Sequence, residues 1–261
     1  MPPRARRPAR TGRSIRPLRA LADLALGLLP LAACAFTTFR LLGLPPQYFA
    51  DVLGIYTLLA ALIVWFLPSD LPPPGLGAAN QITLVRATLI VPVAALTLQP
   101  APPAAGALWW IVAISAVALA LDGVDGLAAR RRGQETRFGA RFDMELDAFL
   151  MLVLAVLVWQ TARVEAWVLL IGAPRYLFVA AGWRWPLLTA ELPASLRRKA
   201  VCVVQGIGLI VCLAPIVPPE PASHAAAGAL ALLVYSFAVD VIWLIVNAPE
   251  RVRSRRPGHA R

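Results

Sequence analysis

Eight apolar runs follow one another along this 261-residue chain, each close to the roughly 20 residues that a helix needs to cross a bilayer. The hydrophobic fraction of 59% and the mean hydropathy of +0.69 agree with this pattern and argue against a soluble protein. We therefore predict an all-α fold, a polytopic bundle of membrane helices. The runs cover residues 20–42, 50–67, 82–98, 107–128, 141–162, 164–185, 200–217 and 225–248.

The basic residues gather in a few segments between the apolar runs. A formal net charge of +11 would suggest a nucleic-acid partner in a soluble protein, but here the arginines indicate topology, because basic segments stay in the cytoplasm. Loops near residues 43–49, 99–106 and 214–224 contain neither Lys nor Arg, and the exceptions Arg40 and Arg163 lie at helix ends. We expect no nucleic-acid partner, a location in the bacterial inner membrane, and both termini in the cytoplasm. The segments placed there are residues 1–19, 130–141, 184–199 and 251–261.

Proline-rich segments at residues 68–74, 100–103 and 215–221 predict loops, because proline cannot continue a helix. The first of them separates two N-terminal runs from the other six. Three further prolines lie inside runs and predict kinks or breaks: Pro30, Pro92 and Pro174. We divide the chain into a basic tail (1–19), two extra transmembrane helices with a linker (20–77), a six-helix core (78–250) and a second basic tail (251–261).

Three cysteines, Cys34, Cys202 and Cys212, lie in apolar runs without the spacing of metal ligands, so we expect buried, unreactive thiols. The stretch Leu31-Ala-Ala-Cys34 also looks like a bacterial lipoprotein cleavage site. Chance in a helix rich in Ala and Leu explains it better, and we expect this helix to be retained.

Four aspartates lie on two neighbouring runs, at the side that we place in the cytoplasm. On a helix, Asp122 and Asp125 are roughly 60° apart and Asp143 and Asp147 roughly 40° apart, so each pair points in one direction. A carboxylate inside a membrane helix costs at least roughly 2.5 kcal/mol and therefore needs a compensating partner. Oxygen ligands without His or Cys suit Mg²⁺ or Mn²⁺, which usually bind together with substrate phosphates. The pattern predicts a site for two divalent ions and a diphosphate.

Each pair of acids has a glycine one helical turn away on the same face. Gly126 follows Asp122 by four residues, and Gly139 precedes Asp143 by four. A glycine in this position leaves room for a nucleotide. The alternative, which also applies to Ala129, is close packing of helices through small residues.

The segment from Asp122 to Asp147 resembles the signature of the CDP-alcohol phosphatidyltransferases, Asp-x2-Asp-Gly-x2-Ala-Arg-x8-Gly-x3-Asp-x3-Asp, and fills every fixed position of it. Upstream, Asn80-x2-Thr83-x2-Arg86 is similar to the start of the first core helix in that family. The resemblance covers residues 78–250. It implies a CDP-linked lipid donor, typically CDP-diacylglycerol, an alcohol acceptor that displaces CMP, and often pairing into a homodimer.

The resemblance also implies roles for individual residues. Asp122, Asp125 and Asp143 would hold the metal, while Asp147 would join them and act as general base. Three small residues would let the cytidine nucleotide approach, and Arg130 would offset its charge or pair with an aspartate. Asn80 and Thr83 would bind the nucleotide or the carboxylates, with helix capping as the alternative for Asn80. The small residues are Gly126, Ala129 and Gly139.

The acceptor would be a small polar alcohol or an alcohol phosphate. A phosphate needs basic residues, although topology and binding to headgroups of membrane lipids also explain those present here. Relatives similar to phosphatidylglycerophosphate synthases carry Gly-Lys-x2-Thr-x2-Gln at the fifth core helix. The stretch from Arg198 to Gln205 lacks that Gly and Thr, so glycerol 3-phosphate is not indicated. The basic candidates are Arg86, Arg141, Arg175, Arg197, Arg198 and Lys199.

Two further acids lie outside the pairs. Glu145 is roughly 200° around the helix from Asp143 and is expected to point away from the metal. Asp240, inside the last run, is expected to pair with a basic residue or with Gln205.

Three alternatives to a phosphatidyltransferase are open. An intramembrane prenyltransferase also binds diphosphates through aspartate pairs, but its motifs lack the Gly-x2-Ala-Arg element and the spaced glycine. A transporter or cation pathway would explain buried acids but not the glycines on the same faces. A catalytically silent relative is the third.

Overall fold

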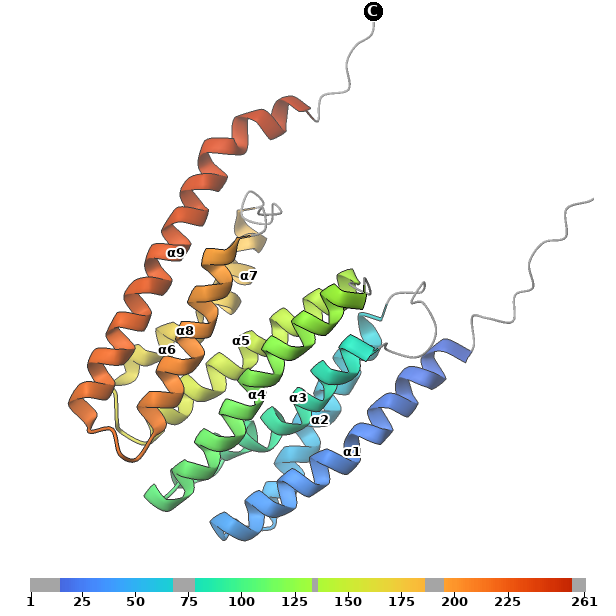
Figure 1. Ribbon diagram of the computed structural model, residues 1–261, viewed down its shortest axis with the longest axis vertical. Coiled ribbons are helices and arrows are strands. Elements are labelled where there is room, and N and C mark those ends of the chain that lie inside the picture. The colour runs from blue at the N-terminus through green and yellow to red at the C-terminus, as the bar shows by residue number, and fades with distance from the viewer. Residues whose placement is uncertain (1–14, 68–77, 133–135, 186–194, 255–261) are drawn as a thin grey trace, which may run out of the picture. The chain divides into compact units, whose positions relative to one another are not determined.

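A computed structural model describes residues 15–67, 78–132, 136–185 and 195–254, and within these residues every element is helical (Figure 1). The predicted all-α membrane bundle is thereby confirmed. The chain forms two compact units, residues 1–147 and residues 148–261, so that the boundary falls inside one helix, α5 (Arg137–Gln160).

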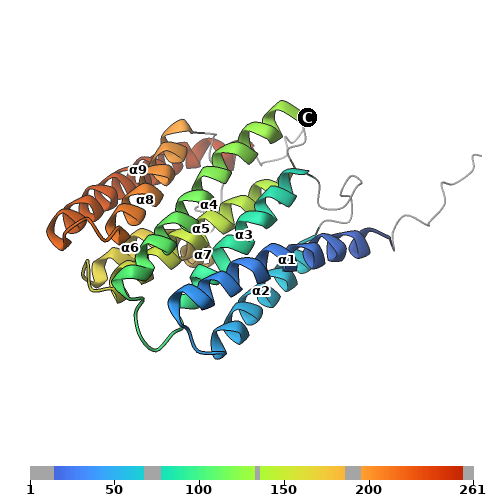
Figure 2. The same cartoon turned by 60° about the horizontal axis from the view of Figure 1, so that its bottom comes forward.

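The first unit is built around α3 (Ala78–Leu96). This helix packs against α1 (Ile15–Leu42), α2 (Gln47–Trp65) and α4 (Ala105–Arg132) (Figures 1 and 2). Apolar side chains of α3 form the core of the unit, because its neighbours cover it on several sides. Those buried include Ala87, Ile90, Val91, Val93, Ala94, Ala95 and Leu96.

Polar contacts attach the two N-terminal helices to α3 and to the turn that follows it. The amide nitrogen of Gln81 donates a hydrogen bond to Asp23 of α1 over 3.1 Å, and that of Gln99 donates one to Asp51 of α2 over 2.9 Å. An acid inside an apolar membrane helix needs such a partner. The extra helices are therefore integral to the unit that contains α3.

The second unit contains the end of α5 and a pair of packed helices, α8 (Leu196–Leu213) and α9 (Pro219–Ser254). Arg163 donates hydrogen bonds to the carbonyls of Cys212, Ala214 and Val217, over 3.2, 2.8 and 3.0 Å. The last carbonyls of a helix have no partner within it. This arginine, an exception to the charge pattern, thus supports the connection between α8 and α9.

The sixth apolar run is broken rather than straight. It forms a short 3-10 helix (Ala166–Val168), α6 (Leu169–Gly172) and α7 (Pro174–Arg184), with a bend of 66° before α7. Pro174 occupies the first position of α7, so the predicted break is confirmed there. Pro30 and Pro92 lie inside α1 and α3, which the structure assigns as uninterrupted helices.

The helix ends differ from the sequence-based prediction in several places. The proline-rich segment 215–221 is only partly a loop, because Pro219 and Pro221 belong to the first turn of α9, where a missing N–H has no cost. Helices α1 and α9 extend to Ile15 and Ser254, into the segments predicted as tails. The segment at residues 68–74 lies outside the described residues.

Four described helices are long and apolar enough to cross a membrane, or five if the bent pair counts as one span. The other three runs fold as α3, α5 and α8; of these, α3 is apolar over Asn80–Leu96 but is shorter than the four spans. The four spans are Ala20–Leu42, Gln47–Trp65, Ala105–Gly123 and Pro219–Val246.

Of the cysteines, Cys212 is buried as expected, whereas Cys34 and Cys202 are only half-buried, and all three are free thiols.

Candidate active site

The start of α5 is fixed by a side-chain cap and by contact with α3. The backbone N–H of Gly139 donates a hydrogen bond to Oγ1 of Thr136 over 3.0 Å, which is the geometry of an N-terminal cap. A Cβ atom on Gly139 would overlap Oδ1 of Asn80. The missing side chain therefore lets α5 approach α3. This contact supports the alternative that Gly139 serves close packing of helices.

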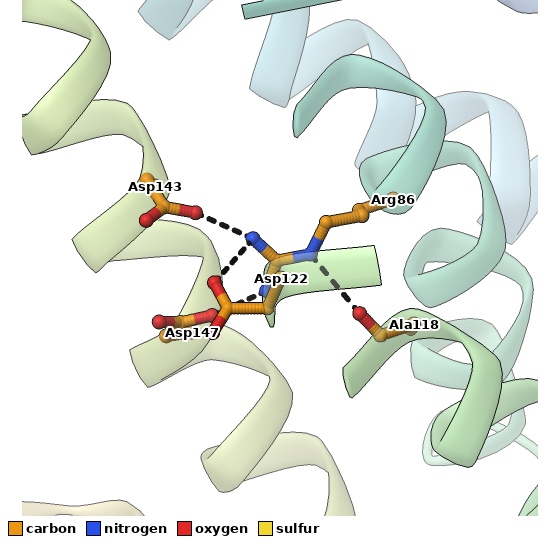
Figure 3. Close-up of polar contacts among 5 residues, drawn as sticks. All are labelled: Arg86, Ala118, Asp122, Asp143 and Asp147. Carbon is orange, nitrogen blue, oxygen red and sulfur yellow. Dashed lines mark hydrogen bonds and ion pairs between the residues drawn. The ribbon is translucent and has the colours of Figure 1, made fainter. Parts of the chain in front are cut away.

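Three helices of the first unit bring four charged side chains together (Figure 3). Arg86 comes from α3, Asp122 from α4, and Asp143 and Asp147 from successive turns of α5. Nη1 of Arg86 lies 2.9 Å from Oδ1 of Asp122 and also bonds Oδ1 of Asp143, while Nη2 lies 2.5 Å from Oδ1 of Asp147. The predicted convergence of the two acid-bearing helices is confirmed for these three aspartates.

Arg86 is the most deeply buried member of the cluster, with an exposed fraction of 0%. Its Nε donates a further hydrogen bond to the carbonyl of Ala118, one helical turn before Asp122, over 3.1 Å. A buried charge is tolerated only when it is paired and hydrogen-bonded. The carboxylates and this carbonyl meet that requirement, so α3, α4 and α5 are tied together at one point.

The cluster has the chemistry of a divalent-cation site. Each of the three aspartates offers an oxygen atom, and these atoms all lie within 4.8 Å of one another. Carboxylate oxygens are the preferred ligands of Mg²⁺ and also suit Mn²⁺. Among the side chains that the structure describes here, three aspartates share the single guanidinium of Arg86, which favours binding of an additional cation.

Two more polar side chains predicted for the site are buried on α3. Asn80 and Thr83 have exposed fractions of 4% and 3%, and with Arg86 they occupy every third position of the helix. Asn80 lies after the start of α3, inside its first turn, rather than at the capping position. Its role stays a prediction from the sequence.

Four residues of the predicted nucleotide and metal sites have side chains outside the described part of the structure. The backbone of α4 continues through them as a helix. Their roles stay predictions from the sequence. They are Asp125, Gly126, Ala129 and Arg130.

The basic candidates for acceptor binding are spread over both units. Arg141 is exposed on α5 in the first unit, as is the acid Glu145. In the second unit Arg175 is half-buried on α7, while Arg198 and the exposed Lys199 lie in the first turn of α8. Of these candidates, only Arg86 is brought to the acid cluster within the first unit.

Asp240 was expected to pair with a basic residue or with Gln205, and the structure shows it paired with basic residues. It accepts hydrogen bonds from Arg197 over 2.5 Å and from Arg198 over 3.2 Å. Arg197 also bonds the hydroxyl of Ser236, over 2.6 Å. Gln205, the other proposed partner, instead donates to the carbonyl of Ala229 over 2.7 Å. Arg197, proposed as a ligand for lipid headgroups, has protein partners.

Contact between Arg86 and the aspartates is the feature that sequence reasoning missed, because Arg86 was assigned to the acceptor. A cation buried near several acids pairs with them at the lowest electrostatic cost. The periodic polar face of α3, from Asn80 to Arg86, was the signal that could have placed it there.

Comparison with known proteins places the chain in a family. No curated protein and no solved structure matches it. The family model described as CDP-alcohol phosphatidyltransferase matches residues 76–242, a range that includes α3, the acid cluster and most of α9. The chain therefore belongs to the CDP-alcohol phosphatidyltransferase family.

Proposed function

We propose that this membrane protein transfers a phosphatidyl group from CDP-diacylglycerol to the hydroxyl of a small alcohol or alcohol phosphate, in phospholipid synthesis. Membership of the family supports transfer from a CDP-alcohol in general. The observation that supports the site most directly is the convergence of Asp122, Asp143 and Asp147 around Arg86. The cluster lies within the matched segment.

The reaction needs one bond to form and one to break. The acceptor oxygen attacks the phosphorus atom that carries diacylglycerol, the pyrophosphate P–O bond breaks, and CMP leaves with the bonding electrons. Asp147 takes the proton of the hydroxyl as general base. Its side chain is 19% exposed and so combines burial with access.

Asp122, Asp125 and Asp143, joined by Asp147, would hold two divalent ions, Mg²⁺ or Mn²⁺. When bound, such ions stabilise negative charge on the phosphate oxygens and on the leaving group. The chain itself supplies positioning, because α3, α4 and α5 fix the acids relative to one another through Arg86.

The nucleotide would lie against the small residues of the motif. Gly126, Ala129 and Arg130 on α4 and Gly139 on α5 are proposed to border the cytidine phosphate, with Asn80 and Thr83 as hydrogen-bonding residues. The burial of both side chains and the position of Asn80 beside Gly139, at the start of α5, support this assignment. The basic segments between the helices support a cytoplasmic position for the site.

The test is an assay of the detergent-purified protein with CDP-diacylglycerol, Mg²⁺ or Mn²⁺, and a panel of polyols, amino alcohols and their phosphates. Release of CMP together with one lipid product identifies both the reaction and the acceptor. Absence of CMP release with every acceptor would refute the proposal. Consumption of a prenyl diphosphate in the same preparation would support the prenyltransferase alternative instead.

A further inference from the structure

Arg86 shares its carboxylate partners with any ion that the cluster binds. Its guanidinium contacts one oxygen of each of three aspartates, at 2.9 Å from Asp122 and 2.5 Å from Asp147, with Asp143 as the third. An Mg²⁺ ion held by these acids would lie about 2.1 Å from its ligand oxygens. Guanidinium and ion are both cations, so they compete for the same negative charge.

The guanidinium cannot simply be released from the acids. Arg86 is completely buried, and a buried arginine without a charged partner is strongly destabilising. If ions take over the carboxylates, Arg86 needs another anion at the same place. The diphosphate of the proposed donor is such an anion, and the planar fork of an arginine matches phosphate oxygens through two parallel hydrogen bonds.

We propose that Arg86 couples the binding of divalent ions to the binding of the donor diphosphate. Without a diphosphate, the guanidinium occupies the carboxylates and weakens ion binding. With a diphosphate, it transfers its hydrogen bonds to phosphate oxygens, and the carboxylates bind ions more tightly. Thermodynamic reciprocity requires that ions tighten nucleotide binding by the same factor. This role rests on the proposed function and replaces the assignment of Arg86 to the acceptor.

The experiment measures Mn²⁺ binding to the detergent-purified, full-length protein by calorimetry or electron paramagnetic resonance. Titrations are made without nucleotide, with CDP, which has a diphosphate, and with CMP, which has one phosphate. In the unaltered protein we expect CDP to tighten Mn²⁺ binding about tenfold or more, within the usual range of such couplings. CMP should have a much smaller effect.

Arg86→Gln removes the competing charge. We expect Mn²⁺ alone to bind this variant about tenfold more tightly than the unaltered protein, with the gain from CDP falling below about threefold. Arg40→Gln is the matched control, because it removes an exposed arginine from α1 in the same unit and should change neither value. Unchanged Mn²⁺ affinity or an unchanged gain from CDP in Arg86→Gln would overturn the inference.

Arg86→Lys decides the question if Arg86→Gln does not fold. Lysine keeps the positive charge but lacks the fork, so the gain from CDP should fall while the protein stays folded. A gain equal to that of the unaltered protein would also overturn the inference. If the unaltered protein binds both Mn²⁺ and CDP without mutual gain, the inference fails and the proposed function stands. If it binds neither, the proposed function fails.

Discussion

Asn80 of α3 and Gly139 of α5 lie so close together that a side chain at Gly139 would collide with Asn80. A Cβ atom on Gly139 would overlap Oδ1 of Asn80 and lie 3.0 Å from Oγ1 of Thr136, which caps α5. The two residues are far apart in sequence, yet their contact sets the position of the helix that bears Asp143 and Asp147. The absence of a side chain at Gly139 thus allows this contact.

Gly139→Ala should destabilise the protein by about 1–3 kcal/mol, because the added methyl group has to displace Asn80 or shift α5. Thermal unfolding in detergent measures this. Gly54→Ala is the control, since nothing lies within 4 Å of a Cβ atom at that position of α2. In an Asn80→Ala background, Gly139→Ala should cost much less. Equal melting temperatures for Gly139→Ala and Gly54→Ala would contradict the packing argument.

Asp147→Asn should lower the rate of CMP release by a factor of at least about 100, because the amide cannot accept the proton of the acceptor. Binding of CDP should change less than the rate does, since Asn keeps the size of Asp and one accepting oxygen. Glu145→Gln removes an exposed acid from the same helix and should leave the rate intact. Full activity in Asp147→Asn would eliminate it as the base.

Asp122→Asn should weaken Mn²⁺ binding as well as turnover. Its carboxylate contributes one of the three oxygen atoms that converge within 4.8 Å, so neutralising it removes both a ligand and a charge. Titration with Mn²⁺ measures the loss, with Glu145→Gln again as the matched control. An affinity equal to that of the unaltered protein would exclude Asp122 from the ion site.

Chelation by EDTA should stop CMP release, and added Mg²⁺ or Mn²⁺ should restore it. Among the described side chains, three carboxylates share the guanidinium of Arg86, and ions are proposed to supply the additional positive charge during the reaction. The rate is measured before chelation, after it and after the ion is returned. Turnover that persists in excess EDTA would rule out the proposed role of the ions.

The sequence predicted those features that depend on local pattern. Apolar runs predicted the helices because burial in lipid needs only length and hydropathy, and the spacing of Asp143 and Asp147 predicted one shared face. The sequence did not predict the contacts between segments that are far apart along the chain. The pairing of Arg86 with three acids and the closeness of Asn80 to Gly139 depend on how α3 packs against α4 and α5.

The break at Pro174 was predicted from the sequence, but its geometry was not. A proline inside an apolar run predicts a kink or a break, but the angle of 66° depends on the packing around it. Close contact fixes the end of α6, where a Cβ atom on Gly172 would lie 2.6 Å from the Cα atom of Leu152. Such an approach of two backbones has no signature in the sequence beyond the glycine itself.

In the second unit, Asp240→Asn should lower the stability by about 1–3 kcal/mol, because Arg197 loses a charged partner at 2.5 Å in a largely buried position. Thermal unfolding measures the loss, and Lys199→Gln, which changes an exposed residue of the same turn, is the control. The double variant Asp240→Asn with Arg197→Gln should lose less stability than the sum of the losses in the two single variants. Strict additivity would show that the pair contributes no coupling.

Tyr56→Phe tests whether the two N-terminal helices act as one support for α3. The buried hydroxyl of Tyr56 on α2 donates a hydrogen bond to the carbonyl of Leu24 on α1 over 2.7 Å, and it fills the space beside Gly27. Its loss should cost about 1 kcal/mol, the usual value for one internal hydrogen bond, and lower the melting temperature. Tyr235→Phe removes a hydroxyl from a residue that is 60% exposed and should leave the melting temperature unchanged. Helices α1 and α2 both pack on α3, in the unit that holds Arg86. If Tyr56→Phe and Tyr235→Phe have equal melting temperatures, this hydrogen bond between α1 and α2 adds nothing to the stability of that unit.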